Sequence, residues 1–212
     1  GSGSPKDIET MFQLIYLDFT APRLDTAVFM ALKNQVEPYL ANRGSSPDEV
    51  FSDTVQVTMS QHHFRARPLT TATFSKVNLD RAYAFYRERF ADASDFTFVF
   101  VGNVDTLTLK PLVEKYLASL PSLGRKESFR DVGESPPKGV VERVVRKGVE
   151  PKANTIITFT GPCRYAPETR FAIRATMELF QIKLNESLRE QLGGAYSPSA
   201  SGGCARTPRQ EY

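Results

Sequence analysis

The sequence has little of the residue types that most often reveal a function. Its 212 residues include two histidines, two cysteines and no tryptophan. His62 and His63 are adjacent, so their rings point in different directions from any helix or strand and are poorly placed to bind one metal ion together. The zinc-binding motif His-x-x-Glu-His is absent. We therefore expect this chain to contain no metal ligand and no catalytic residue.

The two cysteines, Cys163 and Cys204, lie far apart and outside any Cys-x-x-Cys spacing. They can form a disulfide if the strands near them pair, but we expect two small thiols that are buried or half-buried. So few cysteines do not decide the redox compartment. A cysteine nucleophile has little support, because neither residue has a histidine near it in the sequence.

Charge and apolar runs argue against two further classes of protein. The chain carries 27 Lys and Arg against 24 Asp and Glu, a net charge of +3, without a dense basic stripe. We therefore expect no nucleic-acid partner. The apolar runs are far shorter than the roughly 20 residues that a membrane-spanning helix needs, so we expect no membrane span. Residues 1–4 are set aside as a cloning scar.

Hydrophobic patterning predicts both helices and strands. Helices are expected where apolar residues recur every three or four positions behind a capping residue or a proline. Strands are expected where short apolar or β-branched runs lie between turn residues. The predicted helices cover 24–42, a stretch opened by Ser46-Pro47, 79–90, 110–120 and 167–192. The predicted strands cover 11–20, 96–101, 140–145, 154–160 and 196–205.

These elements predict an α+β fold, in which mostly antiparallel sheets are each covered by a layer of helices. The run 96–101 is apolar throughout, so we expect a central strand covered on both faces. A polar stretch rich in serine, glycine and proline interrupts the pattern, and residues 125–137 are predicted to be a linker.

The run from Leu188 to Ser197, LREQLGGAYS, is the most informative segment. It ends the last predicted helix with two glycines and begins a strand, so Arg189 and Tyr196 stand on either side of a tight turn. Both side chains can then donate hydrogen bonds to a backbone carbonyl of a bound ligand. Spacing alone favours a simpler reading, in which Arg189 is a cation at the helix end and Tyr196 belongs to the core.

This run resembles an LRE-x-x-G-x-x-Y-S pattern in the non-catalytic half of the insulinase/pitrilysin-like zinc metallopeptidases, which include the mitochondrial processing peptidases. Two other stretches are similar to segments of that family. One runs from AFYRERF at 84–90 to FTFVFVGNVD at 96–105, and the other is DIETMFQLIYL at 7–17. Their order and spacing, more than any single motif, carry the resemblance.

The resemblance implies the non-catalytic C-terminal half of a bacterial zinc protease, with truncated processing-peptidase-like domains. Residues 5–124 would be the latter part of one domain and residues 138–212 the beginning of a second. Arg189 and Tyr196 would bind the substrate backbone. Zinc would belong to the full-length protein and not to this piece.

Further partners and a location follow from the same resemblance. The expected partners are a peptide substrate and a catalytic half, in the same protein or in a co-encoded subunit. Bacterial relatives lead us to expect a periplasmic location. Truncated sheets would expose strand edges, so a homodimer of the piece is also expected to be possible.

The alternative reading is a structural or partner-binding module that keeps the peptidase fold and contributes nothing to catalysis. A His-x-x-Glu-His motif upstream in the same gene would favour the substrate-binding reading. Its absence there and from any co-encoded partner would favour the structural module.

Overall fold

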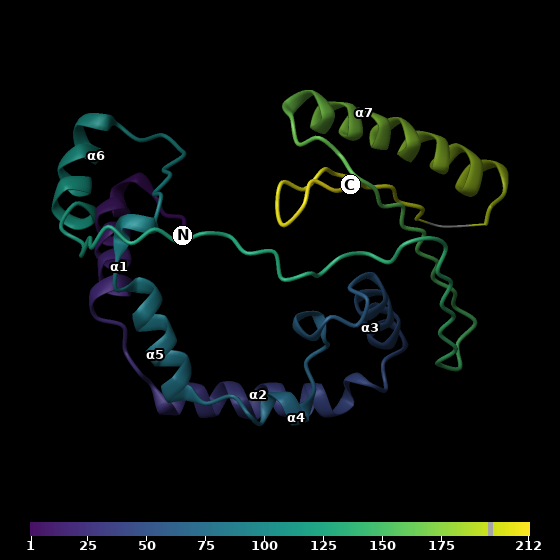
Figure 1. Ribbon diagram of the computed structural model, residues 1–212, viewed down its shortest axis with the longest axis horizontal. Coiled ribbons are helices and arrows are strands. Elements are labelled where there is room, and N and C mark those ends of the chain that lie inside the picture. The colour runs from purple at the N-terminus through teal and green to yellow at the C-terminus, as the bar shows by residue number, and fades with distance from the viewer. Residues whose placement is uncertain (195–196) are drawn as a thin grey trace. The chain divides into compact units, whose positions relative to one another are not determined.

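The structure is a computed structural model that describes residues 1–194 and 197–212. It is mainly helical, with 50% of its residues in helices, 1% in strands and no sheet in the described part of the chain. Figure 1 shows helices joined by long extended segments. The prediction of an α+β fold with antiparallel sheets is therefore wrong.

The chain divides into two compact units, each assembled from two stretches of sequence. Unit 1 comprises Gly1–Val50 and Pro68–Ser128, and unit 2 comprises Phe51–Arg67 and Phe129–Tyr212. The predicted linker, 125–137, contributes to both. Its first residues bond within unit 1, where the Glu127 N–H donates to Asp95. Its last residues bond within unit 2, where the Gln61 amide donates to the carbonyls of Ser135 and Pro136.

Unit 1 is built from helices whose starts follow the capping rules. The Asp25, Asn78 and Asp105 side chains each accept a backbone N–H from the first turn of the helix that follows. Its helical elements are η1 (Pro5–Asp7), α1 (Ile8–Thr20), α2 (Thr26–Arg43), the first turn of α3 (Pro47–Met59), α4 (Thr71–Phe74), α5 (Leu79–Phe90), η3 (Ala93–Asp95), α6 (Thr106–Leu112) and the π-helical η4 (Val113–Leu117). The helices predicted at 24–42 and 79–90 and behind Ser46-Pro47 are thereby confirmed.

Helix α1 occupies the residues for which a strand was predicted, 11–20. Its aromatic and branched composition is typical of strands, but its spacing is helical. The side chains of α1 that pack against the core recur at intervals of three and four: Ile8, Met11, Phe12, Ile15, Tyr16 and Phe19. The helical period places all of them on one face, and burial of that face outweighs their preference for strands.

The core of unit 1 forms around Phe12, which is fully buried. The Phe12 ring stacks on the Phe100 ring with centroids 5.0 Å apart. Residues 96–101 are extended rather than a strand, and only one side of them is covered: Phe98 and Phe100 pack on the core, whereas Val99 and Val101 are 77% and 92% exposed. The prediction of a central strand covered on both faces is wrong.

The predicted strands at 140–145 and 154–160 are also extended without a ladder. Among the described residues, no backbone hydrogen bond joins 140–145 or 154–160 to another segment. Within the part of the chain that is described, one isolated bridge is present, and it pairs Pro162 with Glu211. Apolar, β-branched composition favours extended backbone, but a strand requires a neighbour to satisfy its N–H and C=O groups. Ile157 and Phe159 accordingly remain 76% and 78% exposed.

Asp92 fastens the end of the α5 region to the segment that leaves η4. Its buried carboxylate accepts four hydrogen bonds: from the Ser94 hydroxyl at 2.6 Å, the Ser94 N–H at 2.9 Å, the Leu123 N–H at 3.0 Å and the Arg125 N–H at 2.9 Å. These donors, the Ser94 side chain first among them, hold the pKa of Asp92 well below its ordinary value. The ionised form of Asp92 is thus the form that the folded chain requires.

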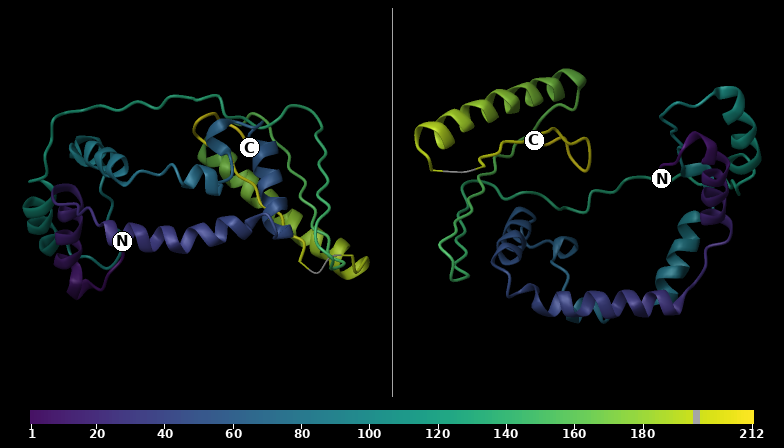
Figure 2. Two further views of the ribbon diagram at one scale, coloured as in Figure 1. Left: turned by 90° about the horizontal axis from the view of Figure 1, so that it is seen from below. Right: turned by 180° about the vertical axis from the view of Figure 1, so that it is seen from behind.

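Unit 2 contains the rest of α3, η2 (Phe64–Ala66), α7 (Pro167–Leu184) and the π-helical η5 (Asn185–Gln191). The predicted helix at 167–192 is confirmed, with a π-helical end. Figure 2 shows α7 lying beside the extended segment near the C-terminus. None of the helices described in either unit is both long enough and apolar enough to cross a bilayer.

Truncation of Phe12 tests the core of unit 1. Phe12→Ala removes a fully buried ring and should lower the free energy of unfolding by about 3–5 kcal/mol. Leu107→Ala is the matched control, because Leu107 is 83% exposed and its loss should cost less than about 0.5 kcal/mol. Urea unfolding followed by far-UV circular dichroism measures both, and equal losses would contradict this core.

The Asp92 carboxylate predicts a pH dependence of stability. Because its pKa is lowered on folding, its stabilisation is fully present above the unfolded pKa, about 4, and is lost as the pH falls below that value. Asp92→Asn should lower the melting temperature at neutral pH and flatten its decline between about pH 5 and pH 2. The exposed Asp80→Asn is the control. Superimposable pH profiles for Asp92→Asn and the wild type would refute the role.

Candidate functional site

Arg189 lies on η5, the π-helical turn that ends the longest helical stretch of unit 2. Pro167 starts this stretch, where its missing N–H costs nothing. Gly193 ends it with φ +58°, a left-handed conformation that glycine adopts without steric cost. The Gly194 N–H then donates to the Leu188 carbonyl at 2.9 Å and closes the turn. The helix and glycine turn predicted around Arg189 are therefore present.

Arg189 is exposed, in the last turn of the helical stretch, where the helix dipole favours a cation. π-helical turns are rare and are frequent at functional sites. The π-helical turn alone does not identify a site, because η4 in unit 1 is also π-helical and packs into the core. Tyr196, the second predicted site residue, lies outside the described residues, so a cavity shared by Arg189 and Tyr196 stays a prediction.

The segment that follows the turn is fastened to α7 by Gln181. The Gln181 Nε2 atom donates to the Pro198 carbonyl at 2.8 Å and to Asn185 Oδ1 at 3.3 Å. Its Oε1 atom accepts from the Ala200 N–H at 2.7 Å. One side-chain amide thus makes the pair of hydrogen bonds that a neighbouring strand would make.

A disulfide between Cys163 and Cys204 fastens the far end of this segment. The expectation of two thiols is wrong, and the alternative of a pair is the one the structure shows. Near the disulfide, the Cys163 N–H donates to the Gln210 carbonyl, and Gly161 and Tyr212 exchange backbone hydrogen bonds. Residues 161–163 and 210–212 therefore lie side by side next to the start of α7.

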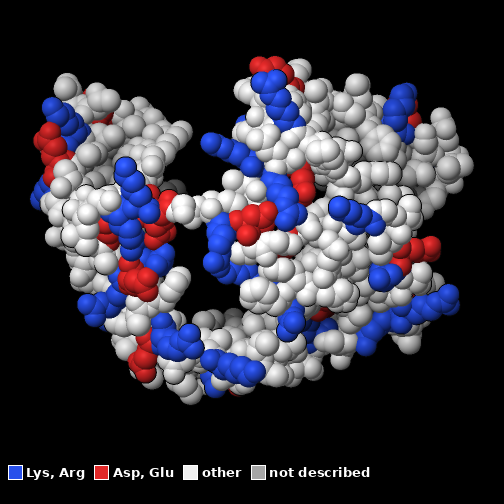
Figure 3. Space-filling model, viewed as in Figure 1, with Lys and Arg blue, Asp and Glu red and all other residues white. Residues whose placement is uncertain are grey.

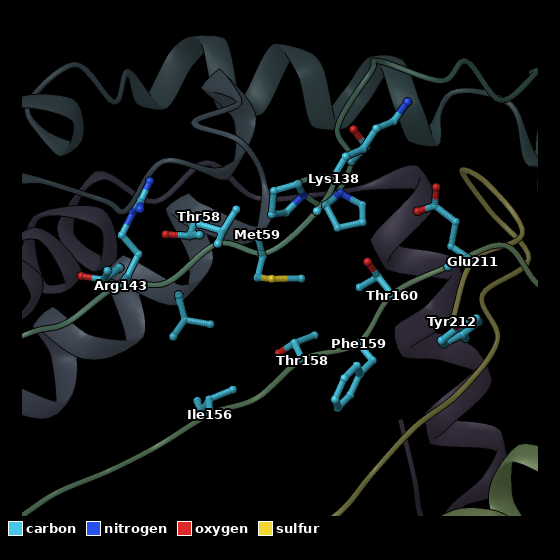
Figure 4. A pocket seen from close by; sticks show the side chains of 18 of the residues that line it. Thr58, Met59, Lys138, Arg143, Ile156, Thr158, Phe159, Thr160, Glu211 and Tyr212 are labelled. Atoms are coloured by element: carbon cyan, nitrogen blue, oxygen red, sulfur yellow. The ribbon is translucent and has the colours of Figure 1, made fainter.

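Unit 2 also contains an open groove of about 640 Å³, shown in Figure 4. It is lined by parts of four stretches of that unit, 51–59, 135–145, 156–162 and 209–212. Met59 from α3 and Thr158 and Thr160 from the facing segment extend toward a common space, with Lys138 and Arg143 at the lining. Arg189 is not among the lining residues. The groove has both polar and apolar lining residues and suits a ligand of mixed polarity.

The two histidines occupy the turn after α3 and do not form a metal site. His63 Nε2 lies 3.1 Å from the Val132 carbonyl, and its Nδ1 accepts from the Arg65 N–H. Its neighbour His62 has φ +61°. No group of three or more His, Cys, Asp or Glu side chains gathers in a way that could hold a metal ion anywhere in the described ranges. The donor groups of these described residues do not fit a zinc ion.

Basic and acidic side chains lie close to one another at several places in the described part of the chain. On the face shown in Figure 3, basic and acidic side chains are interspersed. Several basic residues are already in ion pairs within their own units, such as Arg125 with Asp95 at 3.1 Å and Arg209 with Asp131 at 2.8 Å. Such pairing agrees with the mixed signs of charge on that face.

Comparison with known proteins identifies the class of this chain. A family model described as the peptidase M16 inactive domain matches residues 76–209, more than half of the chain. The chain therefore belongs to that family, and the resemblance to the non-catalytic half of insulinase-like zinc peptidases is confirmed.

Its relatives are named as zinc proteases. It is 23% identical over 201 residues to the probable zinc protease PqqL of Haemophilus influenzae, covering 93% of this chain and 21% of that protein. It is 26% identical over 198 residues to the probable zinc protease PqqL of Escherichia coli, covering 91% and 21%. It is 30% identical over 116 residues to the zinc protease PQQL-like of Arabidopsis thaliana, covering 54% and 12%. The chain thus spans about a fifth of the length of the two bacterial relatives. No solved structure matches it significantly.

Thiol titration tests the disulfide. The unreduced, denatured chain should show no thiol reactive with Ellman's reagent, and the reduced chain should show both cysteines. Replacing both by serine should lower the free energy of unfolding by roughly 4 kcal/mol, because the loop between them is long. Two reactive thiols before reduction would contradict the structure.

Proposed function

We propose that this chain is the substrate-holding, non-catalytic domain of a zinc metalloendopeptidase. It would bind the backbone of an extended peptide, while a catalytic half elsewhere, in the same protein or in a co-encoded subunit, would hold the zinc and cut the peptide. Two observations support this: the match to an inactive peptidase domain, and the names of relatives about five times as long as the matched region.

The observation that carries the proposal is the placement of Arg189 in the last turn of a long helical stretch, directly before a glycine turn. A guanidinium presents five N–H donors in a fixed plane and keeps its charge at every physiological pH. Peptide backbones offer carbonyl oxygens at regular intervals. An exposed arginine at a helix end can therefore donate to a backbone carbonyl without regard to the peptide's side chains.

We propose the same role for Tyr196, whose phenol is an uncharged hydrogen-bond donor. A charged donor and a neutral donor on the two sides of one turn would hold neighbouring peptide units. Hydrogen bonds to charged groups contribute about 1.5–3 kcal/mol and neutral ones about 0.5–1.5 kcal/mol. Arg189 would then contribute the larger share of affinity.

The disulfide supports a proposal about location. Disulfides persist in oxidising compartments and are rare in the cytosol of mesophiles. Cys163 and Cys204 are paired, so we propose that the chain works in such a compartment, in line with the periplasmic location expected from its bacterial relatives.

Peptide binding by the 212-residue chain tests the function. A fluorescein-labelled, unstructured peptide should bind with an affinity that Arg189→Ala lowers about ten- to a hundredfold and Tyr196→Phe about tenfold or less. Arg174→Ala, an exposed arginine on α7, is the control and should bind as the wild type does. Fluorescence anisotropy measures all four proteins.

Two results would count against the proposal. Equal affinity in Arg189→Ala, Arg174→Ala and the wild type would remove Arg189 from the site. Absence of binding by the wild type at high concentration would favour the structural or partner-binding module.

A further inference from the structure

Four contacts fix the segment 198–204 in a single register on α7. Gln181 bonds Pro198 and Ala200. Gly202 lies against the preceding turns of the helix: a Cβ built on it would be 3.1 Å from Met177 Sδ and 3.5 Å from Ile173 Cγ2. Cys204 is bonded to Cys163, just before α7 begins. As the segment proceeds, its partners move backward along the helix, so the segment runs antiparallel to α7.

Among these contacts, only those of Gln181 are hydrogen bonds to the backbone of the segment. It pairs with the C=O of residue 198 and the N–H of residue 200. A shift of the chain by two residues, which would bring position 198 opposite Oε1, would face the Gln181 acceptor with a proline that has no N–H. The amide therefore selects the observed register and disfavours that slip.

Asn185 holds the Gln181 amide in the orientation that this register needs. Its Oδ1 atom accepts from Gln181 Nε2 at 3.3 Å, so the NH₂ end of Gln181 is fixed and the oxygen faces Ala200. Gln181, Asn185 and Arg189 follow one another at four-residue intervals along the helical stretch. One edge of that stretch thus carries both Arg189, the proposed peptide donor, and the Gln181 amide, whose two bonds to Pro198 and Ala200 we call the Gln181 clamp.

We propose that Gln181 is a positioning residue of the peptide site. By fixing residues 198–200 on the helix that carries Arg189, it sets the geometry between the two sides of the glycine turn. Pro198 follows Tyr196 by two positions in the sequence. The effect of Gln181 on peptide binding rests on the proposed function. Its positioning of residues 198–200 does not, because the described contacts show it directly.

A reporter inside the clamp tests the positioning without any peptide. The chain contains no tryptophan, so Ser199→Trp adds a single indole at an exposed position between the two clamped residues. Its fluorescence anisotropy should be high in this background and should fall, by about half, when Gln181→Leu is added, because a residue freed from both bonds moves on the nanosecond timescale. Glu178→Leu, an exposed position on the same helix, is the control and should leave the anisotropy unchanged.

The conservative variant separates positioning from general loss of structure. Gln181→Glu keeps the acceptor for the Ala200 N–H and loses the donor to Pro198, so it should give an intermediate anisotropy. Far-UV circular dichroism should show the same helix content for all variants. If Gln181→Leu does not fold, the comparison of Gln181→Glu with Glu178→Gln carries the test.

Peptide affinity supplies the second measurement. Gln181→Leu should weaken binding about tenfold, as expected for two lost hydrogen bonds that act only through the segment they hold. An indole that stays immobile in Gln181→Leu and Gln181→Glu would overturn the proposal. A further outcome is an indole that becomes mobile on adding Gln181→Leu while the wild-type chain binds no peptide. That result would support the positioning of residues 198–200 by Gln181 and would count against the proposed function.

Discussion

Polar side chains, rather than a β-ladder, hold two extended segments of this chain, one at Leu123 and Arg125 and one at Pro198 and Ala200. Backbone N–H and C=O groups removed from water need partners, and a sheet is the usual source. Here the carboxylate of Asp92 accepts the N–H groups of Leu123 and Arg125, and the amide of Gln181 serves Pro198 and Ala200. Each clamp binds the backbone at two points, which fixes both the place and the register of a segment that has no strand neighbour.

This constraint explains why single polar residues matter so much in both units. A ladder distributes its stabilisation over many similar bonds, whereas a clamp concentrates it in one side chain. Loss of that side chain leaves part-buried backbone groups without a partner in the protein, which costs more than the bond itself contributes. Asp92 holds its segment as an ionised group, so the stability of this contact depends on pH. In unit 2, the disulfide between Cys163 and Cys204 fastens a segment covalently.

The helices could be predicted from sequence because their signals are local. Capping residues such as Asp25 and Asn78 act within three positions of the helix start. The strand predicted at 11–20 is wrong, because the composition of this stretch is typical of strands whereas the spacing of Met11, Phe12 and Phe19 is helical. The strands were overpredicted for a different reason: an apolar run shows that a segment can be extended, but not that a partner lies beside it.

The site was predictable only in part for the same physical reason. The helix and the glycine turn around Arg189 follow from proline and glycine chemistry. The Cys163–Cys204 pair depends on tertiary approach, and spacing alone left it open. Gln181 was missed, although the sequence held one signal: a polar residue stands within the apolar stripe that contains Met177 and Leu184. A polar side chain at such a position has to find backbone or side-chain partners, and here it finds both.

Residue-resolved hydrogen exchange tests most directly whether clamps replace a ladder. We expect slow exchange at the amides of Leu123, Arg125 and Ala200, which donate to side-chain oxygens, and nearly unprotected exchange across residues 155–159. Uniform protection across 155–159 together with fast exchange at Ala200 would contradict it, because those amides would then be held by a neighbouring strand and the Gln181 clamp would not exist.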